Sequence, residues 1–450
     1  MQSARGTMTL GRAVIWFAAA YLAAIAGYLG LSAAAGRLLG PDSFGYFVVA
    51  LTLAMVAGQV GLIGVHRSGL REAARLERDD VERLAELRRG VRAVVLVSLP
   101  LAGVVTGLIA WLLAGSQSTV DRAVIAVSVA ALVVLNGLQK LWANYLRGFG
   151  QVRIASMLEG RSGGAVVALL QAAMVAIVWK LFPSWGLAGA LAAVVLGYAI
   201  PVGYASRVVS RHWGHATSTT RVLHDLRKVA ARDWRFASVQ VGTLLNASVE
   251  VWIAGLILTS IDTSMFGAAQ RLSFLVALPM TALQIVFSPS ISRLAVSGSP
   301  EKMQRLLRTG ATLAAAVTAV FALPLMVAPG PILKVVYGPG FQEAITPLVI
   351  LTLALVVNAL TGLAGLTLSM AHREGIAARV QWGALITRVV LGTVAAAALG
   401  LNALALSAAL VSSGMFVFMW RRTKRELGVN TAVTTHIDLS VLKEKPGVQA

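Results

Sequence analysis

The chain has 450 residues and a formal net charge of +20, and it is 57% hydrophobic with a mean hydropathy of +0.76. Only 13% of its residues are charged, whereas a soluble domain carries about 25%, so the composition excludes an ordinary soluble enzyme. The chain contains no cysteine, which excludes disulfides, thiol chemistry and cysteine-based metal sites.

Long apolar segments recur along almost the whole chain. A helix that crosses a bilayer needs roughly 20 mostly apolar residues. The sequence predicts about a dozen such helices, near residues 11–36, 44–65, 92–114, 123–146, 162–181, 185–207, 235–259, 265–288, 309–328, 343–369, 376–398 and 400–420. Lipid offers no partner to backbone N–H and C=O groups, so these segments must be α-helices. We therefore expect an all-α integral membrane protein.

Two parts of the chain resemble each other at one constant offset. Phe44-Gly45 matches Phe266-Gly267, and VLNGLQKLWANYLRGFGQVRIA (134–155) matches VVNALTGLAGLTLSMAHREGIA (356–377). Parallel repeats of this kind are typical of transporters whose substrate path lies between the halves. We expect two six-helix halves around a central cleft, with an N-terminal half at 1–210, a cytoplasmic linker at 211–233, a C-terminal half at 234–425 and a mobile cytoplasmic tail at 426–450.

Lysine and arginine are concentrated in alternate loops. The loops at 66–91 and 209–233 are rich in arginine, whereas the opposite loops hold few cations, namely Arg37, Arg122, Lys180 and Lys334. Cytoplasmic loops of membrane proteins carry this excess, so both termini and the two basic loops are expected in the cytoplasm. Topology explains the net charge, and no nucleic-acid partner is expected.

Four ionisable side chains fall inside predicted helices: Lys140, Glu250, Arg271 and Arg388. Such a group costs at least about 2.5–3.5 kcal/mol at mid-bilayer, so it usually faces a cavity or a partner. We expect Arg271 and Arg388, with Gln270 beside the former, to face a substrate cavity. Lys140 either lines that cavity or snorkels to the cytoplasmic boundary. Glu250 is either the counter-ion of one arginine or a site for H+ or Na+.

Polar side chains form stripes on two predicted helices. Those on the seventh helix share one face, because their spacing places them within about 120° of one another. A polar stripe is hard to place against lipid, so it should line a hydrated cavity or pack on another polar helix. The stripe on the seventh helix consists of Gln240, Thr243, Asn246 and Glu250, and that on the fourth consists of Asn136, Lys140, Asn144 and Arg147.

Three segments carry motifs whose order and spacing are informative. Residues 36–74 contain Leu39-Gly40-Pro41, Asp42 and Phe44-Gly45, followed by Arg67 or Arg71. Residues 266–295 read FGAAQRLSFLVALPMTALQIVFSPSISRLA, and residues 335–354 read VVYGPGFQEAITPLVILTLA. With these three segments in this order, the chain resembles polysaccharide-unit flippases of the multidrug/oligosaccharidyl-lipid/polysaccharide exporter superfamily.

The resemblance implies a non-enzymatic exporter in the bacterial plasma membrane. It would move a polyprenyl-diphosphate-linked oligosaccharide by alternating access, for cell-surface polysaccharide biosynthesis. The implied partners are this lipid-linked glycan, membrane lipid, a glycan-assembly machinery and H+ or Na+ as coupling ion; no cofactor is implied. Lipid II flippases usually have two further C-terminal helices, which favours an oligosaccharide carrier here. The candidate substrate-binding residues are Arg271, Arg388, Lys140, Asn246, Gln240, Gln270 and Asn136, with Glu250 as coupling residue or ion-pair partner.

Two alternatives belong to other functional classes. A cation-coupled drug or metabolite antiporter of the same superfamily would use acidic residues, whereas the ionisable residues inside these helices are mostly cationic. A membrane-embedded glycan-assembly enzyme would show a large extracytoplasmic loop or an acidic catalytic motif, and neither is visible. A GxxxxGK[ST] phosphate-binding loop is also absent from the sequence. The histidines lie in loops or at helix ends, so no metal site is expected.

Overall fold

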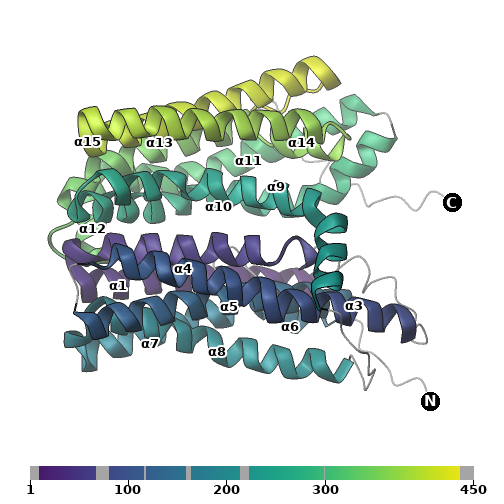
Figure 1. The fold of residues 1–450 in the computed structure, drawn as a ribbon. Coiled ribbons are helices and arrows are strands. Elements are labelled where there is room, and N and C mark those ends of the chain that lie inside the picture. The colour runs from purple at the N-terminus through teal and green to yellow at the C-terminus, as the bar shows by residue number, and fades with distance from the viewer. Residues whose placement is uncertain are drawn as a thin grey trace. The chain divides into compact units, whose positions relative to one another are not determined.

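The computed structural model describes residues 10–66, 81–115, 118–149, 151–158, 164–212, 222–297 and 299–435. Every regular element in these ranges is a helix, which confirms the expected all-α fold (Figure 1). The chain divides into two compact units, unit 1 (Met1–Leu244) and unit 2 (Leu245–Ala450). The division falls inside one helix, α9 (Val222–Ile257).

Unit 1 is a bundle of long helices. In it, α1 packs on α7 and α5, while α5 also packs on α4 and α8. A π-helical turn at 94–98 joins α3 to α4, so that the two form one continuous run. The helices before α9 are α1 (Leu10–Gly61), α3 (Val81–Ala93), α4 (Leu99–Leu113), α5 (Thr119–Gly148), α6 (Val152–Leu158), α7 (Ala165–Leu181) and α8 (Gly186–His212).

Unit 2 begins with the second part of α9 and is also a bundle of helices. Here α10 packs on α11 and α13, and both α13 and α14 pack on α15. The short helices α12 and α14 flank α13 along the chain. The helices after α9 are α10 (Ser260–Val296), α11 (Pro300–Val327), α12 (Pro329–Tyr337), α13 (Ile345–Thr361), α14 (Ala364–Met370) and α15 (Glu374–Leu427).

The predicted membrane spans all correspond to helices. By length and composition, nine helical stretches of the described residues could cross a membrane, and α7 is a shorter apolar helix. Two of these helices, α1 and α15, each contain two predicted spans. The predicted segment 343–369 is divided between α13 and α14. The protein is therefore a multi-pass membrane protein.

The two long helices are each interrupted at a glycine. Gly40 in α1 has φ of 60°, and Gly400 in α15 has φ of 76°. These left-handed values are accessible to glycine at little cost, whereas most residues avoid them. In α1 the next residue is Pro41, which cannot donate the backbone hydrogen bond that continues a helix. Each break separates two membrane-crossing arms.

Small residues allow α4 and α5 to approach closely. A Cβ atom added at Gly103 would lie 2.9 Å from the carbonyl oxygen of Ala130, and one added at Gly107 would lie 2.7 Å from that of Ala126. Glycines four residues apart lie on one helix face, and they let two backbones pack directly in the membrane. Larger side chains at either glycine would push the two helices apart.

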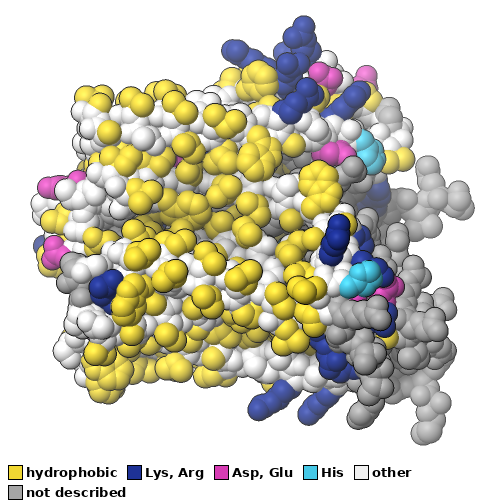
Figure 2. Space-filling view, in the orientation of Figure 1, with side chains coloured by type: hydrophobic (Ala, Val, Ile, Leu, Met, Phe, Trp, Pro, Cys, Tyr) yellow, Lys and Arg dark blue, Asp and Glu magenta, His cyan; other side chains and the backbone are white. Residues whose placement is uncertain are grey.

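Exposed apolar side chains cover the flanks of the helices, as lipid-facing surfaces require. Leu101, Val104 and Leu108 on α4 are 61%, 65% and 60% exposed. Figure 2 shows hydrophobic side chains along the lengths of the helices and Lys and Arg near helix ends. Such an exposed surface would be costly in water but is ordinary in a bilayer.

Two expected boundaries differ from the structure. Of the predicted linker 211–233, residues 213–221 lie outside the described residues, and from Val222 onward the chain already forms α9. The tail expected to be mobile from residue 426 contacts the rest of unit 2 over its first part. Val429 and Thr431 are fully buried against unit 2, because backbone and threonine groups there find partners on α11 and α13. Residues 436–450 lie outside the described residues.

Candidate functional site

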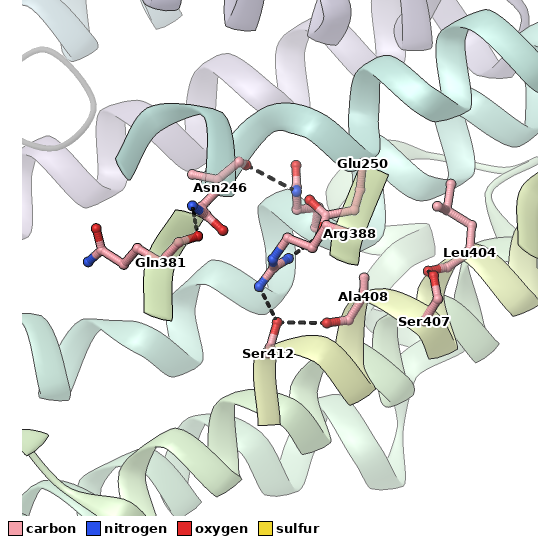
Figure 3. Close-up of polar contacts among 10 residues, drawn as sticks. Asn246, Glu250, Gln381, Arg388, Leu404, Ser407, Ala408 and Ser412 are labelled. Atoms are coloured by element: carbon pink, nitrogen blue, oxygen red, sulfur yellow. Dashed lines mark hydrogen bonds and ion pairs between the residues drawn. The ribbon is translucent and has the colours of Figure 1, made fainter. Parts of the chain in front are cut away.

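A buried ion pair joins α9 to α15 in unit 2. The Nη1 atom of Arg388 donates to Oε1 of Glu250, and the two side chains are 8% and 3% exposed (Figure 3). The Nη2 atom of Arg388 donates to Oγ of Ser412 over 2.7 Å. Ser412 lies beyond the break at Gly400, so Arg388 connects α9 with both arms of α15.

Because this ion pair is buried, the loss of either partner would be costly to the stability of the protein. Two charges removed from water pay a large desolvation cost, which their mutual attraction offsets only when both partners are present. Within the described residues, the Nε atom of Arg388 has no hydrogen-bond partner. Glu250 was expected to pair with one of two arginines or to hold H+ or Na+. The structure pairs it with Arg388.

A second polar contact lies one helical turn earlier on α9. The Nδ2 atom of Asn246 donates to the backbone oxygen of Gln381 over 3.1 Å (Figure 3). Asn246 and Glu250 are four residues apart, and their partners Gln381 and Arg388 are seven apart, so both contacts lie on matching faces of α9 and α15. The second part of the predicted stripe therefore contacts α15.

The other residues of this stripe lie earlier on α9, within unit 1. Gln240 is half-buried and Thr243 is exposed, whereas Glu250 is covered by its partner. The stripe is therefore not uniformly accessible in this conformation. The exposure of Thr243 is compatible with the predicted aqueous face. That Gln240 faces water stays a prediction.

Arg271 and Gln270 lie on α10. Arg271 is only 6% exposed, in a stretch where Ala268, Ala269 and Leu272 are also buried. The Nε2 atom of Gln270 donates to the backbone oxygen of Ala247 on α9 over 3.4 Å. Arg271 is thus a buried cation inside a predicted membrane span, and its role in substrate binding stays a prediction.

A separate polar cluster occupies the interior of unit 1. The Nδ2 atom of Asn136 on α5 donates to the hydroxyl of Tyr198 on α8 over 3.1 Å, and Gln171 on α7 is also buried, at 3% exposed. The Oδ1 atom of Asn136 has no hydrogen-bond partner among the described residues. Lys140, one turn further along α5, is half-buried, and its backbone oxygen accepts from Asn144.

The structure thus assigns the predicted site residues to two places. Asn246, Glu250 and Arg388 come together in unit 2, with Gln270 contacting α9 nearby. Asn136 and Lys140 lie on α5 in unit 1. Among the described residues, no group of three or more His, Asp or Glu side chains could hold a metal ion.

Sequence reasoning missed several polar residues of these sites. Ser412 and Tyr198 each bond to a predicted residue, and Gln171 is buried on α7. Gln59 on α1 is 1% exposed, and neither of its amide atoms has a hydrogen-bond partner within the described residues. Gln59 and Gln171 interrupt otherwise apolar segments, and this signal was available in the sequence. Ser412 gave no such signal, because serine is common in membrane helices.

Comparison with known proteins identifies the fold. No protein-family model matches the chain, and no curated protein matches its sequence. Among solved structures, an inward-closed lipid II flippase MurJ matches with a TM-score of 0.66 and 12% identity, over 91% of this chain and 87% of that one.

Two multidrug transporters also match. An inward-facing MATE family transporter of the MOP superfamily has a TM-score of 0.58 and 14% identity, over 94% of this chain and 95% of that one. The MATE multidrug transporter DinF-BH in complex with R6G has a TM-score of 0.59 and 14% identity, over 98% of this chain and 100% of that one. The chain therefore has the fold that these flippase and multidrug-transporter structures share.

Proposed function

We propose that this protein is a flippase that moves a polyprenyl-diphosphate-linked oligosaccharide across the bacterial plasma membrane for cell-surface polysaccharide biosynthesis. The shared fold supports a transporter, since the solved structures that match include a lipid II flippase and multidrug transporters. The predicted resemblance to polysaccharide-unit flippases supports the choice of a lipid-linked glycan as substrate.

The observation that carries the proposal is an excess of buried positive charge. Among the described membrane-spanning residues of unit 2, two arginines are buried, Arg271 and Arg388, against one buried carboxylate, Glu250. Arg388 and Glu250 neutralise each other. Arg271 is a second buried guanidinium of unit 2, and the fork of a guanidinium matches the oxygens of a diphosphate.

This charge balance distinguishes the substrate classes. A carrier of cationic drugs needs a carboxylate that is free to meet the drug, whereas Glu250 is held by Arg388. A lipid-linked glycan carries its negative charge between an apolar tail and a polar oligosaccharide. Arg271 would bind the diphosphate while the tail stays in lipid, and alternating exposure of the site would complete transport. No bond is broken, so no catalytic residue is required.

Deleting the gene from its host tests the substrate class. We expect the lipid-linked glycan to accumulate on the cytoplasmic side, because export stops while synthesis continues. Glycan analysis of the lipid-linked pool that is accessible in intact cells, and of the total pool after lysis, measures this accumulation. Unchanged surface glycan together with a new sensitivity to cationic drugs would contradict the proposal and favour the antiporter.

The proposed orientation places both termini in the cytoplasm. The alternating distribution of Lys and Arg supports it, because basic loops stay on the cytoplasmic side. A single cysteine at position 215, which lies outside the described residues, would be the only thiol in this cysteine-free chain. We expect an impermeant maleimide to label it only after the cells are opened, and labelling in intact cells would reverse the assigned orientation.

A further inference from the structure

The segment that follows α15 turns back against unit 2. Its residues Leu427–Thr434 form no regular secondary structure after Leu427, yet Val429 and Thr431 are fully buried. Val429 inserts into an apolar cluster that includes Phe287 on α10 and Leu307 on α11. Burial of this kind is not expected of a free tail, because a tail without contacts keeps its apolar side chains exposed.

The same segment binds the break between α13 and α14. The backbone N–H of Val433 donates to the oxygen of Leu360 over 3.1 Å, and Oγ1 of Thr431 donates to the oxygen of Thr361 over 2.7 Å. Both oxygens belong to the last turn of α13, where a helix leaves its carbonyl groups without partners inside the helix. The segment therefore supplies hydrogen bonds that α13 itself cannot make.

Gly362 lets the segment come this close. Its φ is +73°, a left-handed value that favours glycine. A Cβ atom at this position would lie 2.1 Å from the oxygen of Thr431, which is far too short for a contact. The break in the helix and the space for the segment thus depend on one residue.

Further contacts join the segment to α11 and α15. The N–H of Thr434 donates to Oγ1 of Thr312 over 2.9 Å, and the N–H of Asn430 donates to Oε1 of Gln304 over 2.7 Å. The Nε1 atom of Trp420 on α15 donates to Oδ1 of Asn430 over 2.8 Å. One short segment therefore connects three long helices at the point where the α13–α14 connection bends.

We propose that Leu427–Thr434 is an intramolecular strap that holds the α13–α14 break in its present conformation and that is released during the conformational cycle. No helix or strand reinforces these hydrogen bonds, which is a feature of segments that open locally. The first turns of α11 carry Lys302, Arg305 and Arg308, so this end of unit 2 faces water. Water there can hydrate the carbonyls of α13 when the strap leaves.

Two truncations test the holding role in the purified full-length protein in lipid nanodiscs. Removing residues 428–450 deletes the strap, and removing only 436–450 keeps it as the matched control. Amide hydrogen exchange at 362–371 should become at least about tenfold faster without the strap, since one lost hydrogen bond weakens local protection by up to about tenfold and the strap makes two to α13. Exchange in α5 of unit 1 should stay unchanged, which verifies the fold. Equal exchange at 362–371 in both truncations would overturn the proposal.

A cross-link tests the release. The chain has no cysteine, so the double variant Thr312→Cys with Thr434→Cys contains the only two thiols. Closing this pair by oxidation or with a short bismaleimide should slow exchange at 362–371 below that of the uncross-linked protein, because the strap can no longer leave. The single variant Thr312→Cys, treated identically, controls for the reagent. Equal exchange at 362–371 in the cross-linked and the uncross-linked protein would show that the strap never leaves α13 and would contradict its release.

Discussion

Replacing Arg388 with alanine is expected to destabilise the protein by about 3–5 kcal/mol, because a buried carboxylate is left without its partner. Glu250 is 3% exposed, so water cannot readily replace the guanidinium of Arg388 as the partner of its carboxylate. The bond from Arg388 to Ser412, which spans the break at Gly400, is lost as well. Thermal unfolding in detergent measures the effect.

A second variant distinguishes the loss of the ion pair from the loss of packing contacts as the cause of the destabilisation. In the double variant Arg388→Ala with Glu250→Gln, no uncompensated charge remains, and we expect most of the lost stability to return. Arg379→Ala on the same helix is the control, since Arg379 is exposed and should change stability by no more than about 0.5 kcal/mol. A double variant whose loss equals the sum of two single losses would show that the two charges do not interact.

Replacing Arg271 with alanine is expected to abolish export of the glycan while the protein still accumulates in the membrane. The loss of a hydrogen bond to a charged group costs about 1.5–3 kcal/mol, or roughly 10- to 150-fold in affinity. Arg271→Lys keeps the charge but not the planar fork, so it should retain part of the activity. Complementation of the deletion strain at matched protein levels measures both variants.

The competing role for Arg271 is neutralisation of Glu250. The ion pair between Glu250 and Arg388 argues against it, because the carboxylate already has a guanidinium partner. Adding Glu250→Gln to Arg271→Ala should therefore not restore export. Recovery in that double variant would exclude phosphate binding by Arg271 and assign it an electrostatic role instead.

The all-α membrane fold could be predicted because lipid leaves the backbone no alternative to helices. Apolar length alone located the helical stretches of the described residues that could cross a membrane, including the two pairs that the structure joins at Gly40 and Gly400. What could not be predicted is where helices bend without ending. Gly362 looks like any glycine in the sequence, and only the backbone shows that it accommodates the segment around Thr431.

The site was predicted in its residue types and not in its pairings. Burial cost identified Glu250, Arg271 and Arg388 as residues that need partners. The sequence alone does not show which arginine pairs with Glu250, because the pairing depends on which residues of α15 face α9. The contacts of the C-terminal segment could not be predicted for a related reason. Its polar composition suggests mobility, but the carbonyl groups at the end of α13 provide partners that no local pattern reveals.

Reconstitution tests most directly whether this protein moves an anionic lipid-linked glycan across a membrane. Purified protein is placed in liposomes that contain a fluorescent polyprenyl-diphosphate oligosaccharide, and an impermeant quencher is added outside. We expect the inner-leaflet pool to become accessible with the wild-type protein and to stay protected with Arg271→Ala. An inner pool that stays protected with the wild-type protein, in liposomes where the same protein transports a cationic dye, would contradict the account.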